Sequence, residues 1–481
     1  MTRLRTWIAG VLALAGISLA AGQEPVPASV KRPHLILIVA DDLGIGELGC
    51  YGQEKIETPR IDAMAREGLR FTQFYAAAPV CAPTRCSLMT GLHGGHAFVR
   101  DNFEMWGEGQ LALPAGTVTL PKLLQGAGYE TAMVGKWGLG GPKSSGEPSA
   151  QGFDHWFGAY CQRQAQTYYP GHLWRDGKRV PLAGNRADGE TGTQYAPDLF
   201  LEEVEGFLRR EHVQPFFLYL PFTLPHVALQ PEQEDLARYE GRFEERPYRG
   251  ERGYLPHSTP RAAYAAMISR LDRDVGRVLD LLRELALEQN TLVLFVSDNG
   301  PTPDAGGVDT RFFDSTGGLR GRKGELYEGG IRVPLIARWP GRVPAGKTSA
   351  WLGAHYDLMP TLLELAGVAV PDGIDGLSFA AELSGERAPA HEFLFWEFNG
   401  YGGQQALRLG RWKGIRKNLL SELAPLELYD LEADERETKN VAAEHAEIVA
   451  EMHSILAREH RPSREFPLPL LERAPARAAG D

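Results

Sequence analysis

The chain has 481 residues, of which 43% are hydrophobic and 23% are charged, proportions typical of a globular protein with a large core. Its net charge of −11 argues against nucleic acid or an anionic membrane surface as a partner. If such a chain binds an anion, a local cluster of cations must do so, since the overall field is unfavourable.

The first residues have the layout of an export signal. Arg3 and Arg5 precede an apolar run over residues 7–19, and small residues follow at 20–22. The run is short for a membrane span, and no later segment is long and apolar enough to cross a bilayer. We therefore expect a signal peptide over residues 1–22, a periplasmic or secreted protein, and no stable membrane insertion.

Short apolar runs alternate with helical patterns through most of the chain. The first run, residues 34–40, is unbroken and stops just before Asp41. An unbroken apolar run of this length is typical of a parallel strand that is buried on both faces. Further strands are predicted over residues 131–134, 215–221, 291–296 and 333–337, and helices over 58–67, 119–124, 198–210 and 261–287. The charged, Pro-rich segment 231–260 is expected to be an irregular loop. This alternation predicts a large, mostly parallel sheet flanked by helices, which is an α/β fold.

The C-terminal part has a different pattern. Short antiparallel strands are predicted over residues 392–398, 406–409 and 412–416, and a late helix over 443–459. We predict a catalytic α/β domain over residues 23–376. A smaller α+β subdomain with a tail is expected over residues 377–481.

Polar residues follow two of the predicted strands directly. Asp41 and Asp42 come after the first strand, and Asp298 and Asn299 come after residues 291–296. Ligands of parallel sheets bind at the carboxyl ends of the strands, so these four side chains are expected to share one site. Oxygen ligands without histidine or thiolate suit Ca²⁺ or Mg²⁺ better than Zn²⁺. The alternative for each pair is an ordinary strand-end turn or helix cap.

Cys81 opens a segment that begins like a helix and carries Arg85 one turn later. A helix N-terminus and a guanidinium create a positive field that favours anionic chemistry beside the thiol. The alternative is a buried, inert cysteine before a Pro-initiated helix.

The pattern C-x-P-x-R followed by L-x-T-G resembles the signature of the type I sulfatases, a family of the alkaline-phosphatase-like superfamily. The resemblance implies the alkaline-phosphatase-like fold and hydrolysis of a sulfuric ester. It also implies that a formylglycine-generating maturation enzyme converts Cys81 to formylglycine, an aldehyde whose hydrate attacks sulfur. The implied metal is Ca²⁺ rather than Mg²⁺. Its implied ligands are Asp41, Asp42, Cys81, Asp298 and Asn299.

Three further positions match catalytic residues of the family. Lys136, in GKWGLG after a predicted strand, matches a lysine that contacts formylglycine and sulfate. Lys323, shortly before EGGIRVP, matches a lysine that binds the sulfate and polarises the ester, and His226 matches a histidine near the leaving oxygen. Arg85, one turn after the cysteine, is expected to lower the pKa of the attacking hydroxyl. Without the resemblance, Lys136 and Lys323 would be read as ordinary surface lysines.

One position departs from the family pattern. Many sulfatases carry a histidine two residues after the first lysine, and it is thought to take the proton that lets sulfate leave. The present chain has Gly138 there. His93, His96 and His172 are possible substitutes, and none of them is assigned this role.

Residues outside the core motifs are candidates for substrate contacts. The candidate substrate-binding residues are His96, Arg100, Asn102, Gln164 and Trp396. Polar and aromatic residues of this kind favour a sulfated carbohydrate over a simple aryl sulfate, although each could be a plain surface or core residue. Two other functions stay open, a phosphonate or phosphate ester hydrolase of the same superfamily and a non-catalytic protein that binds sulfated glycans.

Overall fold

The computed structural model describes residues 31–105 and 107–472. The chain divides into two units, residues 1–31 and 32–481, and the elements described below belong to the second. The predicted signal peptide lies outside the described residues. Among the helices of the described residues, none has the length and apolar character that a bilayer span requires.

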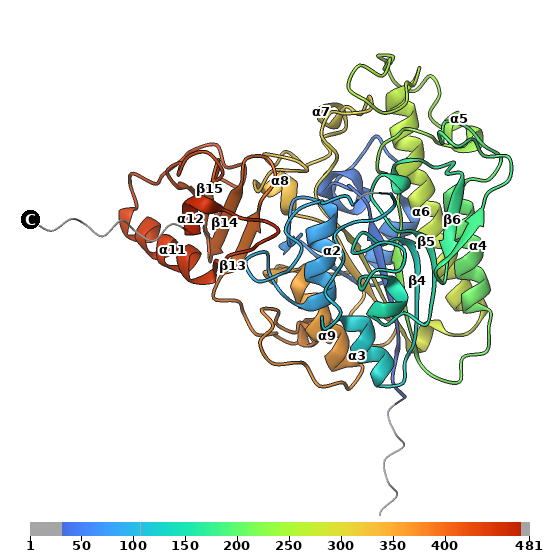
Figure 1. Cartoon of the computed structure of the whole chain (residues 1–481), viewed down its shortest axis with the longest axis horizontal. Helices are drawn as coiled ribbons and strands as arrows, with labels where there is room; N and C mark the ends of the chain where they lie inside the picture. Colours follow the sequence, from blue (N-terminus) through green and yellow to red (C-terminus); the bar gives the residue numbers. More distant parts are fainter. Residues whose placement is uncertain (1–30, 106, 473–481) are drawn as a thin grey trace, which may run out of the picture. The chain divides into compact units, whose positions relative to one another are not determined.

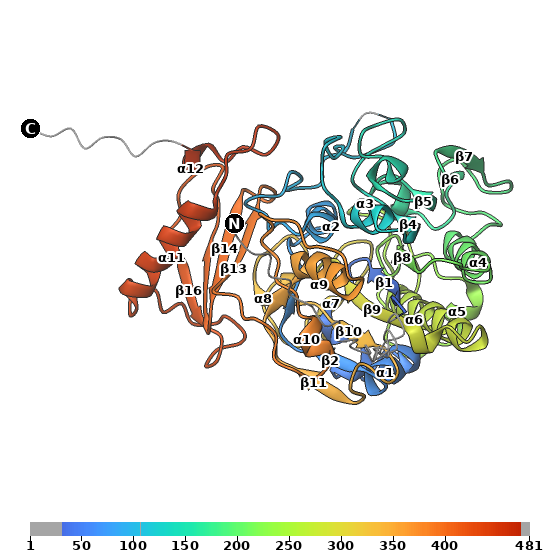
Figure 2. The same cartoon turned by 90° about the horizontal axis from the view of Figure 1, so that it is seen from below.

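A ten-stranded sheet forms the centre of this unit (Figures 1 and 2). Its strands, in spatial order, are β11 (Lys347–Ser349), β2 (Leu69–Phe71), β10 (Leu335–Arg338), β9 (Thr291–Ser297), β1 (His34–Ala40), β8 (Phe216–Pro221), β4 (Glu130–Lys136), β5 (His155–Ala159), β6 (His172–Arg175) and β7 (Lys178–Pro181). The five adjacent strands from β9 to β5 all run parallel to one another. The predicted mostly parallel sheet is confirmed.

The edges of the sheet contain antiparallel pairs. β10 is antiparallel to β9 and β2, and β6 is antiparallel to β5 and β7. A strand that returns from the same end of the sheet at which its predecessor stopped must run the opposite way, as β10 does after β9. The apolar run 333–337 predicted the existence of β10 and did not reveal its direction.

Helices cover both faces of the sheet. Alternate residues of β1 point to opposite sides: Leu35, Leu37 and Val39 belong to one hydrophobic core, and Ile36 and Ile38 to the other. The first face packs against α2 (Cys81–Thr90), α3 (Leu120–Gly126) and α9 (Leu358–Leu365). The second packs against α1 (Pro59–Arg66), α4 (Ala196–Leu208) and α6 (Pro260–Glu284), and Figure 2 shows the two layers.

The C-terminal part forms a four-stranded antiparallel sheet. Its strands are β13 (Leu394–Phe398), β14 (Gln404–Leu409), β15 (Trp412–Arg416) and β16 (Glu427–Asp430), followed by α11 (Ala446–Glu459). One face of this sheet, with Phe395 and Leu407, packs on α11, while Trp396 and Ala406 on the other face join the core beneath α2. The small sheet is therefore held between α11 and the catalytic core. The boundary between residues 376 and 377 stays a prediction.

Short elements complete the fold. These are β3 (Phe74–Tyr75) paired with β12 (Gly353–Ala354), and the helices α5 (Gln233–Ala237), α7 (Thr310–Phe313), α8 (Glu328–Ile331), α10 (Ala380–Leu383) and α12 (Pro469–Glu472). The segment 231–260 contains α5 and, at its last residue, the start of α6, and is otherwise free of named helices and strands. All four cysteines are unpaired.

Candidate active site

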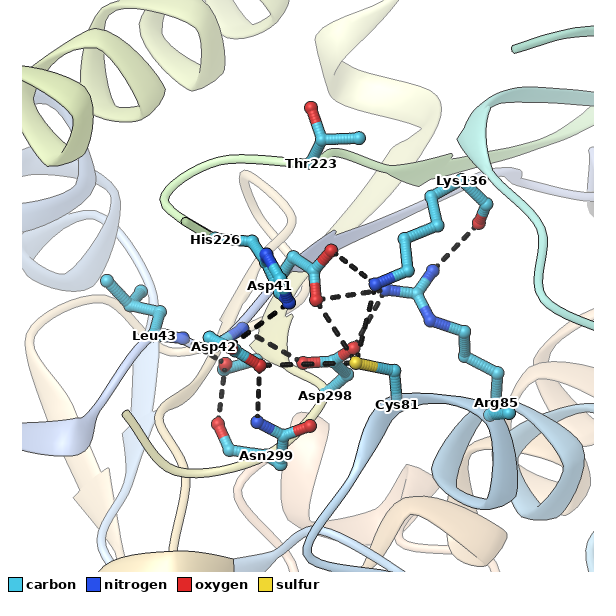
Figure 3. Close-up of polar contacts among 12 residues, drawn as sticks. Asp41, Asp42, Leu43, Cys81, Arg85, Lys136, Thr223, His226, Asp298 and Asn299 are labelled. Carbon is cyan, nitrogen blue, oxygen red and sulfur yellow. Dashed lines mark hydrogen bonds and ion pairs between the residues drawn. The ribbon is translucent and has the colours of Figure 1, made fainter. Parts of the chain in front are cut away.

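The two pairs of polar residues that follow strands meet at the carboxyl ends of β1 and β9. Ala40 and Ser297 are partners in the β1–β9 register, so Asp41 and Asp298 follow adjacent strands. The backbone N–H of Asp42 donates to Oδ1 of Asp298 at 3.1 Å. The three carboxylates lie close together (Figure 3). They are fully buried. Each of Asp41, Asp42, Asp298 and Cys81 offers one ligand atom within 4.8 Å of the others, close enough for one metal ion.

Asn299 adds an amide oxygen to this group. Its Nδ2 donates to Oδ1 of Asp42 at 2.8 Å and to the carbonyl of Gly300. Its Oδ1 is buried and has no hydrogen-bond partner among the described residues. Asp42 has a φ of 66°, a left-handed conformation that aspartate tolerates better than most residues. An unpaired amide oxygen beside buried carboxylates is a donor set for a hard divalent cation.

Cys81 lies at the first turn of α2 and points into the carboxylate cluster (Figure 3). Its Sγ is 3.3 Å from Oδ1 of Asp41 and 4.0 Å from Oδ1 of Asp42. Burial, together with the carboxylates of Asp298 and Asp41, raises the pKa of the thiol above its usual range. The side chain is therefore a protonated thiol in this setting and not a ready thiolate nucleophile.

Three cations surround the same point. Arg85, one turn after Cys81, donates from Nη2 to Oδ2 of Asp298 at 2.8 Å. Lys136, at the end of β4, reaches Oδ2 of Asp41 at 2.6 Å and Sγ of Cys81 at 3.4 Å. Nζ of Lys323 lies 2.8 Å from the Asp42 carboxylate and 3.6 Å from Sγ. The three positive charges balance the three carboxylates, so the cluster of side chains is close to neutral.

His226 completes the predicted catalytic set. Its Nδ1 donates to the carbonyl of Val227, and its Nε2 accepts from Nζ of Lys323 at 3.2 Å. Burial, and then the charge of Lys323, lowers the pKa of the imidazole. The ring is therefore neutral, and Lys323 is the member of this pair that carries a proton to donate.

The sequence did not reveal the residues that hold these groups in place. Tyr168 is fully buried, and its hydroxyl lies 2.7 Å from the carbonyl of His226. Gln404 of β14 contacts the loop after Lys323, since its Nε2 donates to the carbonyl of Gly324 at 2.8 Å. A glutamine in a C-terminal strand has no local signal that links it to a catalytic loop.

Two of the predicted substrate-binding residues have structural contacts instead. Trp396 is fully buried, and its indole N–H donates to the carbonyl of Ala76, so neither ring face is free to stack on a sugar. Arg100 is buried and donates to Glu397 and to the carbonyls of Gly95 and Arg461. The prediction of substrate contacts at these two residues is corrected, because the packing of the C-terminal sheet against the catalytic core takes up both side chains.

His96 belongs to a separate cluster near the end of α2. Its Nδ1 lies 2.8 Å from Asp375, and its ring stacks on His93 with centroids 4.2 Å apart. His172, the third candidate for the missing histidine, pairs with Glu108 at 2.6 Å. Each of the three histidines is thus engaged with a carboxylate outside the cluster around Cys81.

Asn102 and Gln164 keep positions from which they can reach a ligand. Asn102 is exposed, and its Oδ1 accepts the backbone N–H of Ala82 in the first turn of α2. Gln164 lines a pocket of about 500 Å³ together with Cys161 and Arg163, and its Oε1 has no partner among the described residues.

Comparisons with known proteins agree with this geometry. The model of the sulfatase family matches residues 33–368, and the model of the C-terminal region of N-sulphoglucosamine sulphohydrolase matches residues 322–461. The N-acetylgalactosamine-6-sulfatase of Canis lupus familiaris is 32% identical over 425 residues, which cover 84% of this chain and 74% of that protein. The steryl-sulfatase of Mus musculus is 32% identical over 488 residues, with 86% and 74% covered.

Solved structures share the fold. The crystal structure of Ps i-CgsB in complex with k-i-k-neocarrahexaose has a TM-score of 0.75 at 28% identity, covering 90% of this chain and 94% of that one. The phosphonate monoester hydrolase of Agrobacterium radiobacter has a TM-score of 0.65 at 20% identity, with 89% and 95% covered. The second likeness concerns the fold alone.

Proposed function

The chain belongs to the sulfatase family, and we propose that it removes sulfate from a sulfated carbohydrate with a formylglycine made from Cys81 and a bound Ca²⁺. One observation carries the proposal. Carboxylates from two strands far apart in the sequence, a cysteine at a helix N-terminus and three cations meet at a single buried point.

The charges of the site support a resident cation. A sulfate monoester is anionic, and the side chains around Cys81 carry as many negative as positive charges. Asp41, Asp42, Asp298 and Asn299 would hold the ion, which would supply the extra positive charge that an anionic ester needs. An all-oxygen set apart from position 81 favours Ca²⁺ over softer metals.

Modification of Cys81 would supply the nucleophile. The hydrated aldehyde of formylglycine carries two hydroxyls on one carbon, one to attack sulfur and one whose loss of a proton expels sulfate and restores the aldehyde. Lys136 and Arg85 lie beside this position and orient and stabilise the anionic oxygens. Both bury their charge next to carboxylates, so they are held rigidly before the substrate arrives.

Lys323 is placed to assist the leaving group. Its Nζ lies between Asp42 and the neutral ring of His226 and is 3.6 Å from Sγ of Cys81. Asp42 raises the pKa of Lys323 well above its ordinary value against the opposing effect of burial, so the ammonium form persists. Lys323 donates its hydrogen bond to the departing oxygen, and His226 fixes the direction of that donor.

The substrate class rests on the surroundings of the site. Asn102 and Gln164 offer amide groups, which bind sugar hydroxyls, and Gln164 faces a pocket large enough for a sugar ring. The similarity to N-acetylgalactosamine-6-sulfatase and to a structure that holds k-i-k-neocarrahexaose supports a carbohydrate. The similarity to steryl-sulfatase is equally strong, so the choice between a carbohydrate and another sulfate ester is made by the assays below. Export, and modification by a formylglycine-generating enzyme, belong to the same proposal.

Two measurements test it. Purified protein is assayed in parallel on 4-nitrophenyl sulfate, 4-nitrophenyl phosphate and position-defined sulfated sugars. The mass of the peptide that contains residue 81 is measured as well, because conversion of cysteine to the aldehyde removes about 18 Da. Release of sulfate from a sugar together with this mass loss is expected. Preference for the phosphate ester would favour the ester hydrolase, and an intact thiol without turnover would favour the glycan-binding protein.

The variant Cys81→Ser, produced in a host that converts only cysteine, separates chemistry from folding. A single hydroxyl cannot expel sulfate by the elimination described, so turnover should fall to background. The melting temperature should stay close to that of the wild type, because the substitution changes one buried atom. Near-normal turnover in this variant would rule out the covalent scheme.

A further inference from the structure

A buried amide without a partner lies next to the proposed catalytic centre. Gln162 follows β5 and is 5% exposed, and neither Nε2 nor Oε1 has a hydrogen-bond partner among the described residues. Leaving a buried polar group unpaired costs about 1–3 kcal/mol per group. Native proteins rarely keep such groups without a ligand or a functional reason.

The amide of Gln162 lies next to Gly138. That glycine has a φ of +90°. Its N–H donates to the carbonyl of Tyr160, and this hydrogen bond places Gly138 next to the segment 160–162. A Cβ added to Gly138 would lie 2.6 Å from Nε2 of Gln162 and 3.6 Å from Cδ of Arg85. The amide of Gln162 thus fills the space that a side chain at position 138 would take, and it does so beside the guanidinium of Arg85.

Arg85 has an unpaired donor at the same place. Its Nη1 donates to the carbonyl of Lys136 and its Nη2 to Asp298, at 2.8 Å each. Its Nε, which is bonded to the Cδ that flanks Gly138, has no partner among the described residues. Both side chains lie beside the position of that added Cβ, and each has an N–H donor without a partner among the described residues, for which an anionic oxygen is a suitable acceptor.

We propose that Gln162 is a sulfate-binding residue, whose amide nitrogen acts with Nε of Arg85 to bind one oxygen of the substrate's sulfate group. This inference rests on the proposed function. An amide does not take up a proton near neutral pH, so Gln162 does not replace the histidine absent at position 138 as a base. Its amide occupies the space that the glycine leaves open, and from there it binds and orients the sulfate.

The test uses Gln162→Leu, which keeps the approximate volume of the side chain and removes both polar atoms. In the absence of ligand, the melting temperature should equal or exceed that of the wild type, because an unpaired buried amide is gone. Inorganic sulfate should raise the melting temperature of the wild type and have little effect on the variant. The kcat/KM on 4-nitrophenyl sulfate should fall about ten- to a hundredfold, as expected for the loss of a hydrogen bond to a charged group.

Gln151→Leu is the matched control. Gln151 is also fully buried, and its Nε2 donates to the carbonyl of Ser145, away from Cys81. Its loss should lower the melting temperature and leave both the sulfate response and kcat/KM unchanged. If Gln162→Leu does not fold, Gln162→Glu keeps the shape and places a negative charge against the anion, and should abolish the sulfate response.

Other results would contradict the inference in distinct ways. A Gln162→Leu variant with wild-type kcat/KM and wild-type sulfate response would overturn it and leave the proposed function intact. A loss of activity that only follows a loss of folded protein, as for a structural residue, would also overturn it. A wild type that neither hydrolyses sulfate esters nor responds to inorganic sulfate would instead refute the proposed function, and this inference with it.

Discussion

At the scale of single residues, the site is organised by burial of opposite charges in equal number. Asp41 is fully buried, an environment that would raise its pKa, yet the charges of Lys136 and Arg85 hold that pKa below its ordinary value. Separating any of these groups would leave a charge in a medium of low dielectric, which is far more costly than at the surface. The unpaired Oδ1 of Asn299 is the one acceptor of the oxygen set that the protein itself does not satisfy by a hydrogen bond among the described residues.

The variant Asn299→Leu tests whether this oxygen binds a metal. Loss of a residue that only supports a metal ligand typically weakens the affinity for the metal ten- to a hundredfold. At a given saturating metal concentration, a tenfold weaker affinity lowers the metal-dependent part of the free energy of unfolding by about 1.4 kcal/mol. Thermal unfolding should show a large stabilisation of the chelator-treated wild type by CaCl₂ and a smaller one for the variant. MgCl₂ is tested alongside.

Asn290→Leu provides the control for the metal experiment. Asn290 donates to the carbonyl of Arg32 near the start of β1, at the opposite end of the sheet from Asp41. The calcium-dependent shift in melting temperature should be unchanged in this variant. Equal calcium responses in the wild type and Asn299→Leu would remove Asn299 from the proposed ligands.

At the scale of elements, sequence reasoning located the site because parallel strands carry a strong local signal. Residues 34–40 were predicted as a strand and form β1 with those bounds, and the polar residues after β1 and β9 lie side by side as expected. Short strands near the edge of the sheet, such as β6 and β7, lack such a signal, since Leu173 is the one fully buried residue in the two strands. Packing between distant elements had no local signal at all, and this explains the corrected assignments of Trp396 and Arg100.

Arg100 gives a test at the scale of elements, because it links the segment after α2 to β13. The change Arg100→Met leaves Glu397 buried with one partner fewer, and removal of one member of a buried ion pair costs about 3–5 kcal/mol. Chemical denaturation should show this loss, while the KM of the folded enzyme stays unchanged. A raised KM with unaltered stability would restore Arg100 as a substrate-binding residue.

Arg411→Met is the comparison for this experiment. Arg411 pairs with Asp430 at the surface, where its side chain is 42% exposed, and ion pairs in water contribute little to stability. The free energy of unfolding should therefore change little. The contrast between the two arginines isolates the effect of burial.

At the scale of the whole molecule, the C-terminal sheet supports the catalytic loop that carries Lys323. Lys413 of β15 lies 2.8 Å from Glu328 and 2.9 Å from Glu437, and all three side chains are fully buried. Glu328 begins α8, shortly after Lys323, and Gln404 of β14 binds the intervening segment at Gly324. The small sheet therefore belongs to the machinery of the site, although none of its residues contacts Cys81 among the contacts described.

Lys413→Met tests this coupling. Two buried glutamates would lose their shared cation, so the free energy of unfolding should fall by about 3–5 kcal/mol. The kcat of the fraction that remains folded should fall too, because the loop of Lys323 loses its support. Lys439→Met, at an exposed pair with Glu444, should change neither quantity appreciably. Unchanged stability in Lys413→Met would show that the buried triad does not hold the two sheets together.

The complete burial of α2 bears on whether modification of Cys81 would come before or after folding. All ten residues of the helix are enclosed, and Cys81 exposes 1% of its surface. The maturation enzyme of the proposed function would have to reach this thiol, which lies among buried residues in the folded protein. If the proposed conversion of Cys81 takes place, it would have to precede folding, and a copy that folded first would keep its thiol.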